Sequence, residues 1–147
     1  MKDGDRSPLK RLVAWKERVR AAWPGVRFES VAVEPDPATL PPASPFDVAV
    51  RVNLGPLDAS EVSVEIFEGP PTSDDTLESG TITKLEPAGR EGETGLFRVT
   101  HRKPAGEGLA YTIRVRPSHP DLAHPNDMGL MLWWGKSREA RRYAASG

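Results

Sequence analysis

The fold is decided by residues 46–67, which read FDVAVRVNLGPLDASEVSVEIF. The first part alternates, with an apolar residue at every second position from 46 to 54. The second part repeats the alternation, with Val62, Val64 and Ile66 set against Ser63 and Glu65. A period of two with β-branched residues on one face predicts half-buried strands, and the residues between the two runs favour a turn. We therefore predict a β-hairpin here, which needs further strands to cover its apolar face.

The composition indicates one globular domain. The chain has 147 residues, 37% hydrophobic and 28% charged, and its net charge of −1 gives no bulk field that favours nucleic acid or an anionic membrane. The absence of cysteine excludes disulfides, thiol catalysis and thiolate zinc sites. No apolar run approaches the roughly 20 residues that span a bilayer, and polar residues follow Met1. We expect a cytoplasmic protein.

An amphipathic helix is predicted at residues 9–23. Ser7 and Pro8 suit the N-cap and the first helical position, and Pro24 and Gly25 stop the helix. Basic and acidic residues cover one face, which we interpret as solvated because the net charge of the chain is close to zero. The apolar stripe on the other face consists of Leu9, Leu12, Val13, Trp15, Val19, Ala22 and Trp23.

Short segments with strand character follow one another along the rest of the chain. The segment 34–45 contains five prolines and is predicted to be a stiff, extended linker, and 87–93 is predicted to be a turn. Residues 135–147 are rich in Arg and Ala and are predicted to form one helical turn or more, or otherwise a tail. Strands are predicted at 26–33 with a register change near Ser30, at 76–85 with an interruption at Gly80, and at 96–100, 111–116 and 129–134.

One helix followed by about seven short strands predicts a mainly β protein. We expect an antiparallel, immunoglobulin-like β-sandwich with one N-terminal amphipathic helix. The chain then divides into the helix (1–25), the β-sandwich domain (26–134) and the tail (135–147).

The histidines were considered as metal ligands. His119 and His124 lie close in sequence to Asp121, Asn126 and Asp127. Each of these two histidines precedes a proline, which imposes an extended backbone, so their spacing does not form a helical pair. We interpret the segment as loop structure.

No catalytic motif accompanies these residues. The remaining histidine, His101, has no suggestive neighbours in the sequence. The chain contains no nucleophile elbow, phosphate-binding loop or dinucleotide fingerprint. We therefore predict no catalytic, cofactor-binding or metal-binding residue.

Four aromatic residues are candidates for contact with a sugar or with a neighbouring domain: Trp133, Trp134, Tyr111 and Trp15. Aromatic rings offer flat apolar faces with a polar edge, but ordinary core packing uses the same property. Trp133 and Trp134 are adjacent on one predicted strand and must face opposite sides of it. At most one of the two can be a core residue while the other remains available.

Four segments in this order carry a resemblance to a known family. They are LVAWKERVRAAWPGV (12–26), VRVNLGPL (50–57) with VSVE (62–65), YTIRVRP (111–117) and HPDLAHPNDMGL (119–130). The first resembles the helix that closes the catalytic part of bacterial and archaeal α-glucan (glycogen and maltodextrin) phosphorylases. The others resemble the C-terminal extension of that family, so the similarity covers roughly residues 9–134.

The resemblance implies a C-terminal accessory domain or fragment, detached from a much longer glycosyltransferase. Enzymes of that family transfer a glucosyl unit between glucan and phosphate and carry pyridoxal phosphate on a lysine. Nothing here resembles the cofactor lysine region or the phosphate-binding residues, so the cofactor and these roles are assigned to no position. The implied partners are the catalytic portion or subunits of an α-glucan phosphorylase, with α-glucan as a further candidate. The alternative is a free-standing carbohydrate-binding or protein-interaction β-sandwich.

Overall fold

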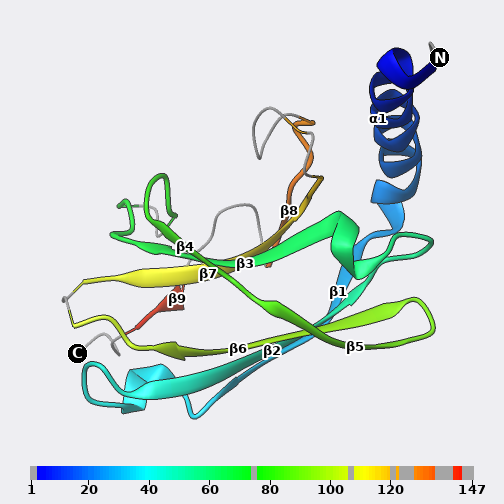
Figure 1. Cartoon of the computed structure of the whole chain (residues 1–147). Coiled ribbons are helices and arrows are strands. Elements are labelled where there is room, and N and C mark those ends of the chain that lie inside the picture. The colour runs from blue at the N-terminus through cyan, green and yellow to red at the C-terminus, as the bar shows by residue number, and fades with distance from the viewer. Residues whose placement is uncertain are drawn as a thin grey trace.

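The computed structural model is mainly β, with one N-terminal α-helix and two antiparallel sheets stacked as layers (Figure 1). It describes residues 3–73, 76–105, 108–119, 122, 128–134 and 141–143, without the side chains of residues 3–9 and 142. Within the described part of the chain, no helix is both long and apolar enough to cross a membrane.

Sheet A has the strand order β1-β2-β6-β5 and is antiparallel throughout. The predicted register change near Ser30 is confirmed, because the pairing of β1 with β2 shifts between Phe28 and Ser30. The strands are β1 (Arg27–Glu34), β2 (Pro45–Asn53), β5 (Glu86–Glu91) and β6 (Thr94–Arg102).

Sheet B has the order β4-β3-β7-β8, and β9 also pairs with β7. Its outer strands are short. Only parts of the segments predicted at 76–85 and 129–134 form strands. The strands are β3 (Val62–Gly69), β4 (Thr81–Lys84), β7 (Ala110–Pro117), β8 (Leu132–Trp133) and β9 (Arg141–Arg142).

The predicted hairpin at 46–67 is wrong. The strands β2 and β3 exist, but β2 pairs with β1 and β6, whereas β3 pairs with β4 and β7. Their connector contains the 3-10 turn η3 (Ala59–Glu61) and carries the chain from one sheet to the other. The two apolar faces therefore cover each other across the core and do not lie side by side in one sheet.

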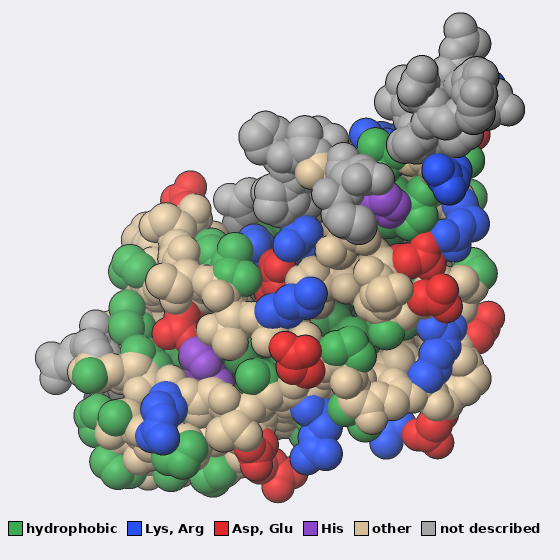
Figure 2. Space-filling view, in the orientation of Figure 1, with side chains coloured by type: hydrophobic (Ala, Val, Ile, Leu, Met, Phe, Trp, Pro, Cys, Tyr) green, Lys and Arg blue, Asp and Glu red, His purple; other side chains and the backbone are tan. Residues whose placement is uncertain are grey.

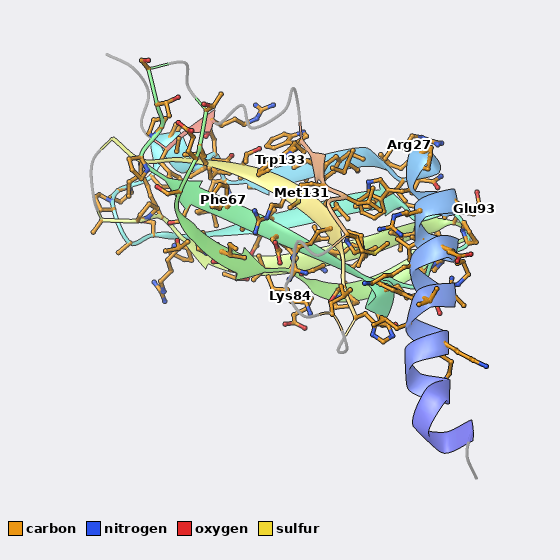
Figure 3. The ribbon with its side chains drawn as sticks, turned by 90° about the horizontal axis from the view of Figure 1, so that it is seen from above. Arg27, Phe67, Lys84, Glu93, Met131 and Trp133 are labelled. Atoms are coloured by element: carbon orange, nitrogen blue, oxygen red, sulfur yellow. The ribbon has the colours of Figure 1, made fainter. Side chains whose placement is uncertain are left out.

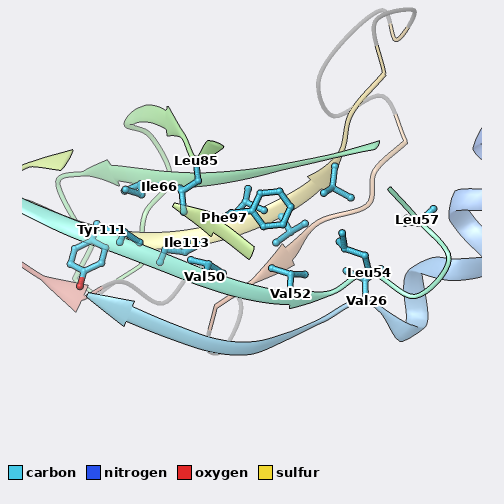
Figure 4. Close-up of a cluster of buried hydrophobic side chains, with 14 of the residues drawn as sticks. Val26, Val50, Val52, Leu54, Leu57, Ile66, Leu85, Phe97, Tyr111 and Ile113 are labelled. Carbon is cyan, nitrogen blue, oxygen red and sulfur yellow. The ribbon is translucent and has the colours of Figure 1, made fainter. Parts of the chain in front are cut away.

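The core lies between the two sheets and includes the inner faces predicted from the alternation (Figure 4). Val48, Val50 and Val52 from β2 and Val64 and Ile66 from β3 are all at most 1% exposed. Burying side chains of this size stabilises the fold by about 1.5–3 kcal/mol each relative to exposure.

The segment predicted as a turn at 87–93 is mostly strand β5, which is a correction. Every residue of β5 is exposed, because the strand lies at the edge of sheet A. An exposed edge strand carries no apolar alternation, so only the turn-forming residues of this segment stood out. The actual turn is at Gly92 and Glu93, where Gly92 has a φ of 59°.

The linker at 34–45 is more folded than predicted. It contains the 3-10 turn η2 (Pro37–Thr39), whose N-cap Asp36 accepts a hydrogen bond from the Ala38 amide. Lys103 Nζ donates to the Leu40 carbonyl, which ties the segment to the end of β6. Proline limits φ without preventing a compact turn, so the proline content did not distinguish the two structures.

Helix α1 (Asp3–Ala22) begins earlier than predicted, so Ser7 is not its N-cap and Pro8 lies inside it. Pro8 lies in the second turn of the helix, where it removes one intrahelical hydrogen bond. The predicted stop is confirmed by the 3-10 turn η1 (Trp23–Gly25). Of the predicted tail, residues 141–142 form β9, and residues 135–140 and 144–147 lie outside the described part.

Candidate functional site

Helix α1 is fastened to the β domain by a polar contact beside an apolar one. Trp15 and Val19 are 7% and 0% exposed and belong to the main core. Trp15 Nε1 donates to Glu61 Oε2 over 2.7 Å, and the Arg18 guanidinium forms an ion pair with the same carboxylate. The Trp15 ring also lies 4.7 Å from the His119 ring. The helix therefore joins the turn before β3 and the segment after β7.

The Glu61 carboxylate is held in its charged form. Its partial burial alone would raise its pKa, but hydrogen bonds from Arg18, the Asp58 amide and Trp15 outweigh burial, so the pKa lies below its ordinary value. The contact is therefore fully charged at neutral pH and weakens only in acid.

Among the described apolar side chains of α1, packing against the β domain begins at Leu12. The helix stands away from the two sheets (Figure 1), and Val13 is 50% exposed. Of the stripe predicted from the sequence, Leu12, Ala22 and Trp23 are partly buried against the core. The stripe thus packs on the core from Leu12 onward, and Val13 remains outside it.

Strands β3 and β7 are buried on both faces, which the alternation did not predict. Ser63 and Glu65 should have faced solvent, yet they are 1% and 2% exposed on the outer face of sheet B. Glu65 accepts hydrogen bonds from Arg114 Nε at 2.8 Å, Arg116 Nε at 2.9 Å and Ser63 Oγ at 2.8 Å. We call these four residues the Glu65 cluster.

Two aromatic rings lie beside the Arg114 guanidinium of the Glu65 cluster. The Arg114 Cζ atom lies 4.9 Å from the centroid of Phe67 and 5.7 Å from that of Trp133, and the two rings are 6.0 Å apart. Cation–π attraction and the ion pair with Glu65 together fix the position of Arg114. Trp133 and Phe67 consequently pack against the paired guanidinium of Arg114.

A second polar cluster lies at the end of β3 away from the α1 contact. Glu68 Oε1 contacts His101 Nε2 at 2.5 Å and accepts a hydrogen bond from Tyr143 Oη at 3.0 Å. The Tyr143 ring lies 4.8 Å from Tyr111 and 6.1 Å from Phe46. This cluster joins sheet A, sheet B and the segment after β9, so it closes that end of the core.

The pKa values of both tyrosines in the chain are raised. Burial raises the pKa of Tyr143, and the neighbouring Glu68 carboxylate raises it further. Burial also raises the pKa of Tyr111, more than the nearby Arg141 lowers it. A neutral phenol is therefore retained at both positions well into alkaline pH.

Two adjoining shallow depressions lie on the outer face of sheet A. They have volumes of about 240 and 230 Å³ and share a floor of Ala32 and Ala49 beside Arg98. Arg51 lines the first depression and Glu34 and Asp47 line the second, so no single sign of charge dominates. Acidic and basic side chains are likewise interspersed over the face seen in Figure 2.

The four aromatic candidates occupy different surroundings. Trp15 and Tyr111 are 7% and 5% exposed, while Trp133 and Trp134 are half-buried. Trp133 packs on the small cluster around Phe67, and Trp134 packs on the main core. The two adjacent tryptophans thus face opposite sides of the strand.

The histidine candidates are separated in space. His101 contacts Glu68, and His119 contacts Trp15. His124, with Asp121, Asn126 and Asp127, lies outside the described residues. Within the described residues, no group of three acidic or histidine side chains could hold a metal ion.

Glu61, Glu65 and Glu68 were not predicted from the sequence. These carboxylates organise the α1 contact, the Glu65 cluster and the cluster with Tyr143, respectively. Each stands at a polar position of an alternating pattern or in a turn, where a solvated side chain is the default expectation. One signal was available: a Glu in one strand and two Arg in another are complementary if the strands pair. The pairing itself, Glu65 opposite Arg114, could not be read without the topology.

Comparison with protein families matches residues 23–135 to the glycogen phosphorylase C-terminal domain. The chain belongs to this family. The match covers the two sheets from η1 to the end of β8, whereas α1 precedes it.

Relatives of this phosphorylase C-terminal domain are much longer proteins. The chain is 28% identical over 123 residues to glycogen phosphorylase of Mycobacterium bovis, which is 83% of this chain and 14% of the relative. It is 26% identical over 130 residues to maltodextrin phosphorylase of Thermococcus litoralis, which is 86% of this chain and 15% of the relative. The chain thus spans about a seventh of the length of these curated relatives.

The depressions of this phosphorylase C-terminal domain do not suit the pyridoxal phosphate that the resemblance implies for the catalytic core. The resemblance implies that this cofactor is held on a lysine. The two depressions on sheet A are open and are lined by no lysine. These residues do not fit the cofactor.

Proposed function

We propose that this chain is a non-catalytic accessory domain of an α-glucan phosphorylase and associates with the catalytic portion of that enzyme. The observation that carries the proposal is the family match over residues 23–135, together with relatives about seven times longer. The relatives' names, glycogen phosphorylase and maltodextrin phosphorylase, supply the proposed substrate class, α-glucan and phosphate.

Helix α1 is the proposed contact with the catalytic portion. It lies before the matched region, and its first half extends away from the sheets with Val13 exposed (Figure 1). The exposed Val13 leaves apolar surface in water, so a partner that covered it would stabilise the helix. The proposed division of the chain follows: residues 1–25 belong with the catalytic portion, 26–134 form the domain and 135–147 form a tail.

The catalytic part of the proposal is tested by phosphorolysis. The chain is incubated with maltodextrin, inorganic phosphate and pyridoxal phosphate, and glucose 1-phosphate is measured against a full-length phosphorylase as the positive control. No product is expected from this chain alone. Product above the no-protein background would refute the non-catalytic role.

A carbohydrate-binding module is the second candidate, because Trp133 is a half-buried ring on the outer face of sheet B. Trp15 and Tyr111 are buried, so their contacts are within this chain. Electrophoresis in a gel containing glycogen distinguishes this candidate: Trp133→Ala should abolish retardation, while Trp134→Ala should not. Equal mobility with and without glycogen would remove this candidate.

The finer fold class is also part of the proposal. We assign the two stacked antiparallel sheets to an immunoglobulin-like sandwich, which is supported by the strand β2–β3 crossing between sheets. Superposition of an experimental structure on immunoglobulin domains would test the assignment, and a different strand order would overturn it.

A further inference from the structure

Strand β1 is the longest edge strand of the two sheets. It runs over 8 residues along one margin of sheet A and pairs with β2 and with no other described strand. Figure 3 shows Arg27, the first residue of β1, on the opposite side of the molecule from Lys84 at the end of β4. The backbone groups on the free side of an edge strand form a template on which another strand can pair.

The other edge strands carry features that hinder such pairing, whereas the second half of β1 does not. Strand β5 contains Pro87, where its register with β6 shifts. Strand β4 has 4 residues and ends in Lys84, and β8 and β9 have 2 residues each. Proline, lysine, bulges and short length all protect an edge. In β1 the register break lies before Ser30, so residues 30–34 form a regular edge whose one charge, Glu34, is at its end.

This regular edge is symmetric about Ala32 in the placement of its side chains. Val31 and Val33 are partly buried against the core. The outer face carries the exposed residues Ser30, Ala32 and Glu34. When two copies pair antiparallel about a two-fold axis at Ala32, Val31 of one copy lies opposite Val33 of the other. Ser30 then lies opposite Glu34, so every side chain stays on its own face of the sheet, as a correct register requires.

The charges on the outer face of sheet A fit the same register. Ser30 is the partner of Arg51 on β2, and Glu34 is the partner of Asp47. Arg51 therefore lies two strands, about 10 Å, from Glu34 of the second copy, with only the small Ser30 between them. The side chains of Arg51 and Glu34 are long enough to meet across this distance, and the axis forms the contact twice. Arg51 is available for it, because its ion pair with Glu91 is exposed.

We propose that this chain self-associates through β1, with β1 of the second copy antiparallel to it, so that sheet A continues across a two-fold axis. The occupant of the edge is a second copy because the symmetry about Ala32 and the reciprocal contact of Arg51 with Glu34 need the same sequence on both sides. The basic depression of one copy then adjoins the acidic depression of the other. A contact of this size is small, so the dissociation constant is about 10 µM or weaker.

Sedimentation velocity of the full chain, at protein concentrations below and above that value, measures the association. We expect a reversible equilibrium between monomer and dimer. Ala32→Lys sets two ammonium groups opposite each other at the axis and should weaken the dimer about tenfold. Ala88→Lys makes the same change on β5, the other edge of sheet A, and should leave the dimer unchanged. Both positions are exposed, so both variants should keep the urea midpoint of the wild type.

A charge exchange tests the register itself. Glu34→Arg and Arg51→Glu each set like charges across the axis and should weaken the dimer, whereas the double variant restores opposite charges and should recover most of the affinity.

Three results would overturn the proposal: a chain that stays monomeric at the highest concentration, equal effects of Ala32→Lys and Ala88→Lys, or a double variant weaker than both single ones. A dimer that Ala32→Lys leaves intact and Val13→Ser abolishes would place the contact on α1 and would overturn it as well. The contact through β1 does not depend on the accessory role, so either proposal can fail while the other stands.

Discussion

The buried carboxylate Glu65 is predicted to stabilise the domain only together with its arginines, which a double-mutant cycle can measure. In the structure the Glu65 side chain is 3% exposed and accepts from Arg114 and Arg116. Glu65→Leu leaves the Arg114 guanidinium buried without a counter-charge, and breaking a buried pair in this way costs about 3–5 kcal/mol. Arg114→Met is milder, at about 1–3 kcal/mol, because Glu65 keeps its bonds from Arg116 and Ser63.

The double variant Glu65→Leu/Arg114→Met should be close to wild type in stability. It removes both buried charges and leaves apolar groups against Phe67, while the half-buried Arg116 can turn to water. Replacing a buried ion pair with apolar residues of similar volume is often neutral or stabilising. The coupling free energy between the two substitutions should therefore be at least about 2 kcal/mol.

Urea unfolding followed by tryptophan fluorescence measures each free energy of unfolding. With a urea m-value of about 1–3 kcal/mol/M, the single Glu65→Leu variant should unfold at a midpoint more than about 1 M below wild type. The reasoning is refuted if the two single effects simply add in the double variant. An unchanged midpoint for Glu65→Leu would refute it equally.

Three further predictions concern the core, a close backbone approach and the tyrosines. Val64→Asp places a charge at a 0% exposed position and should cost about 4 kcal/mol or more, so a cooperative urea midpoint near wild type would contradict the assigned core. Gly80→Ala should cost about 1–3 kcal/mol, because its Cβ would lie 2.0 Å from a backbone oxygen of β3. Gly25→Ala meets nothing within 4 Å and is the matched control; equal midpoints for the two variants would argue against this β3–β4 geometry. Tyr111 and Tyr143 have folded-state pKa values raised above 10, so their stabilisation is complete below that pH and is lost as pH rises through the folded values. Tyrosinate absorbance at 295 nm should therefore appear only with unfolding, and a titration near pH 10 in folded protein would show that the rings are not buried.

The strands that face the core could be predicted because apolar residues at every second position have one physical explanation. The alternation in β2, β3 and β7 identified their inner faces, and the Ser30 register change was visible as a break in the period. Strand β5 could not be predicted, since an exposed edge strand has no apolar face. A strand can thus be predicted from the sequence where at least one of its faces is buried.

Strand partners and buried charges were beyond the sequence for a different reason. Alternation specifies which side chains are inside but not which strands are neighbours, so β2 and β3 were assigned to one hairpin when they face each other across the core. The same ambiguity hid Glu65, whose burial depends on Arg114 from a strand 49 residues away. Of the aromatic candidates, the opposite orientation of Trp133 and Trp134 follows from strand geometry, and their contacts with Phe67 and Arg141 do not.

Hydrogen exchange of helix α1 tests the proposed role most directly. The exchange of backbone amides is followed by mass spectrometry for this chain alone and after mixing with a mycobacterial glycogen phosphorylase from which the matching C-terminal region has been removed. In the isolated chain, amides around the Trp15–Glu61 contact should be protected, while those from Gly4 to Leu12 should exchange much faster. Mixing should slow exchange in the second group. Equal protection of both halves in the isolated chain, unchanged on mixing, would contradict a helix that awaits a catalytic partner.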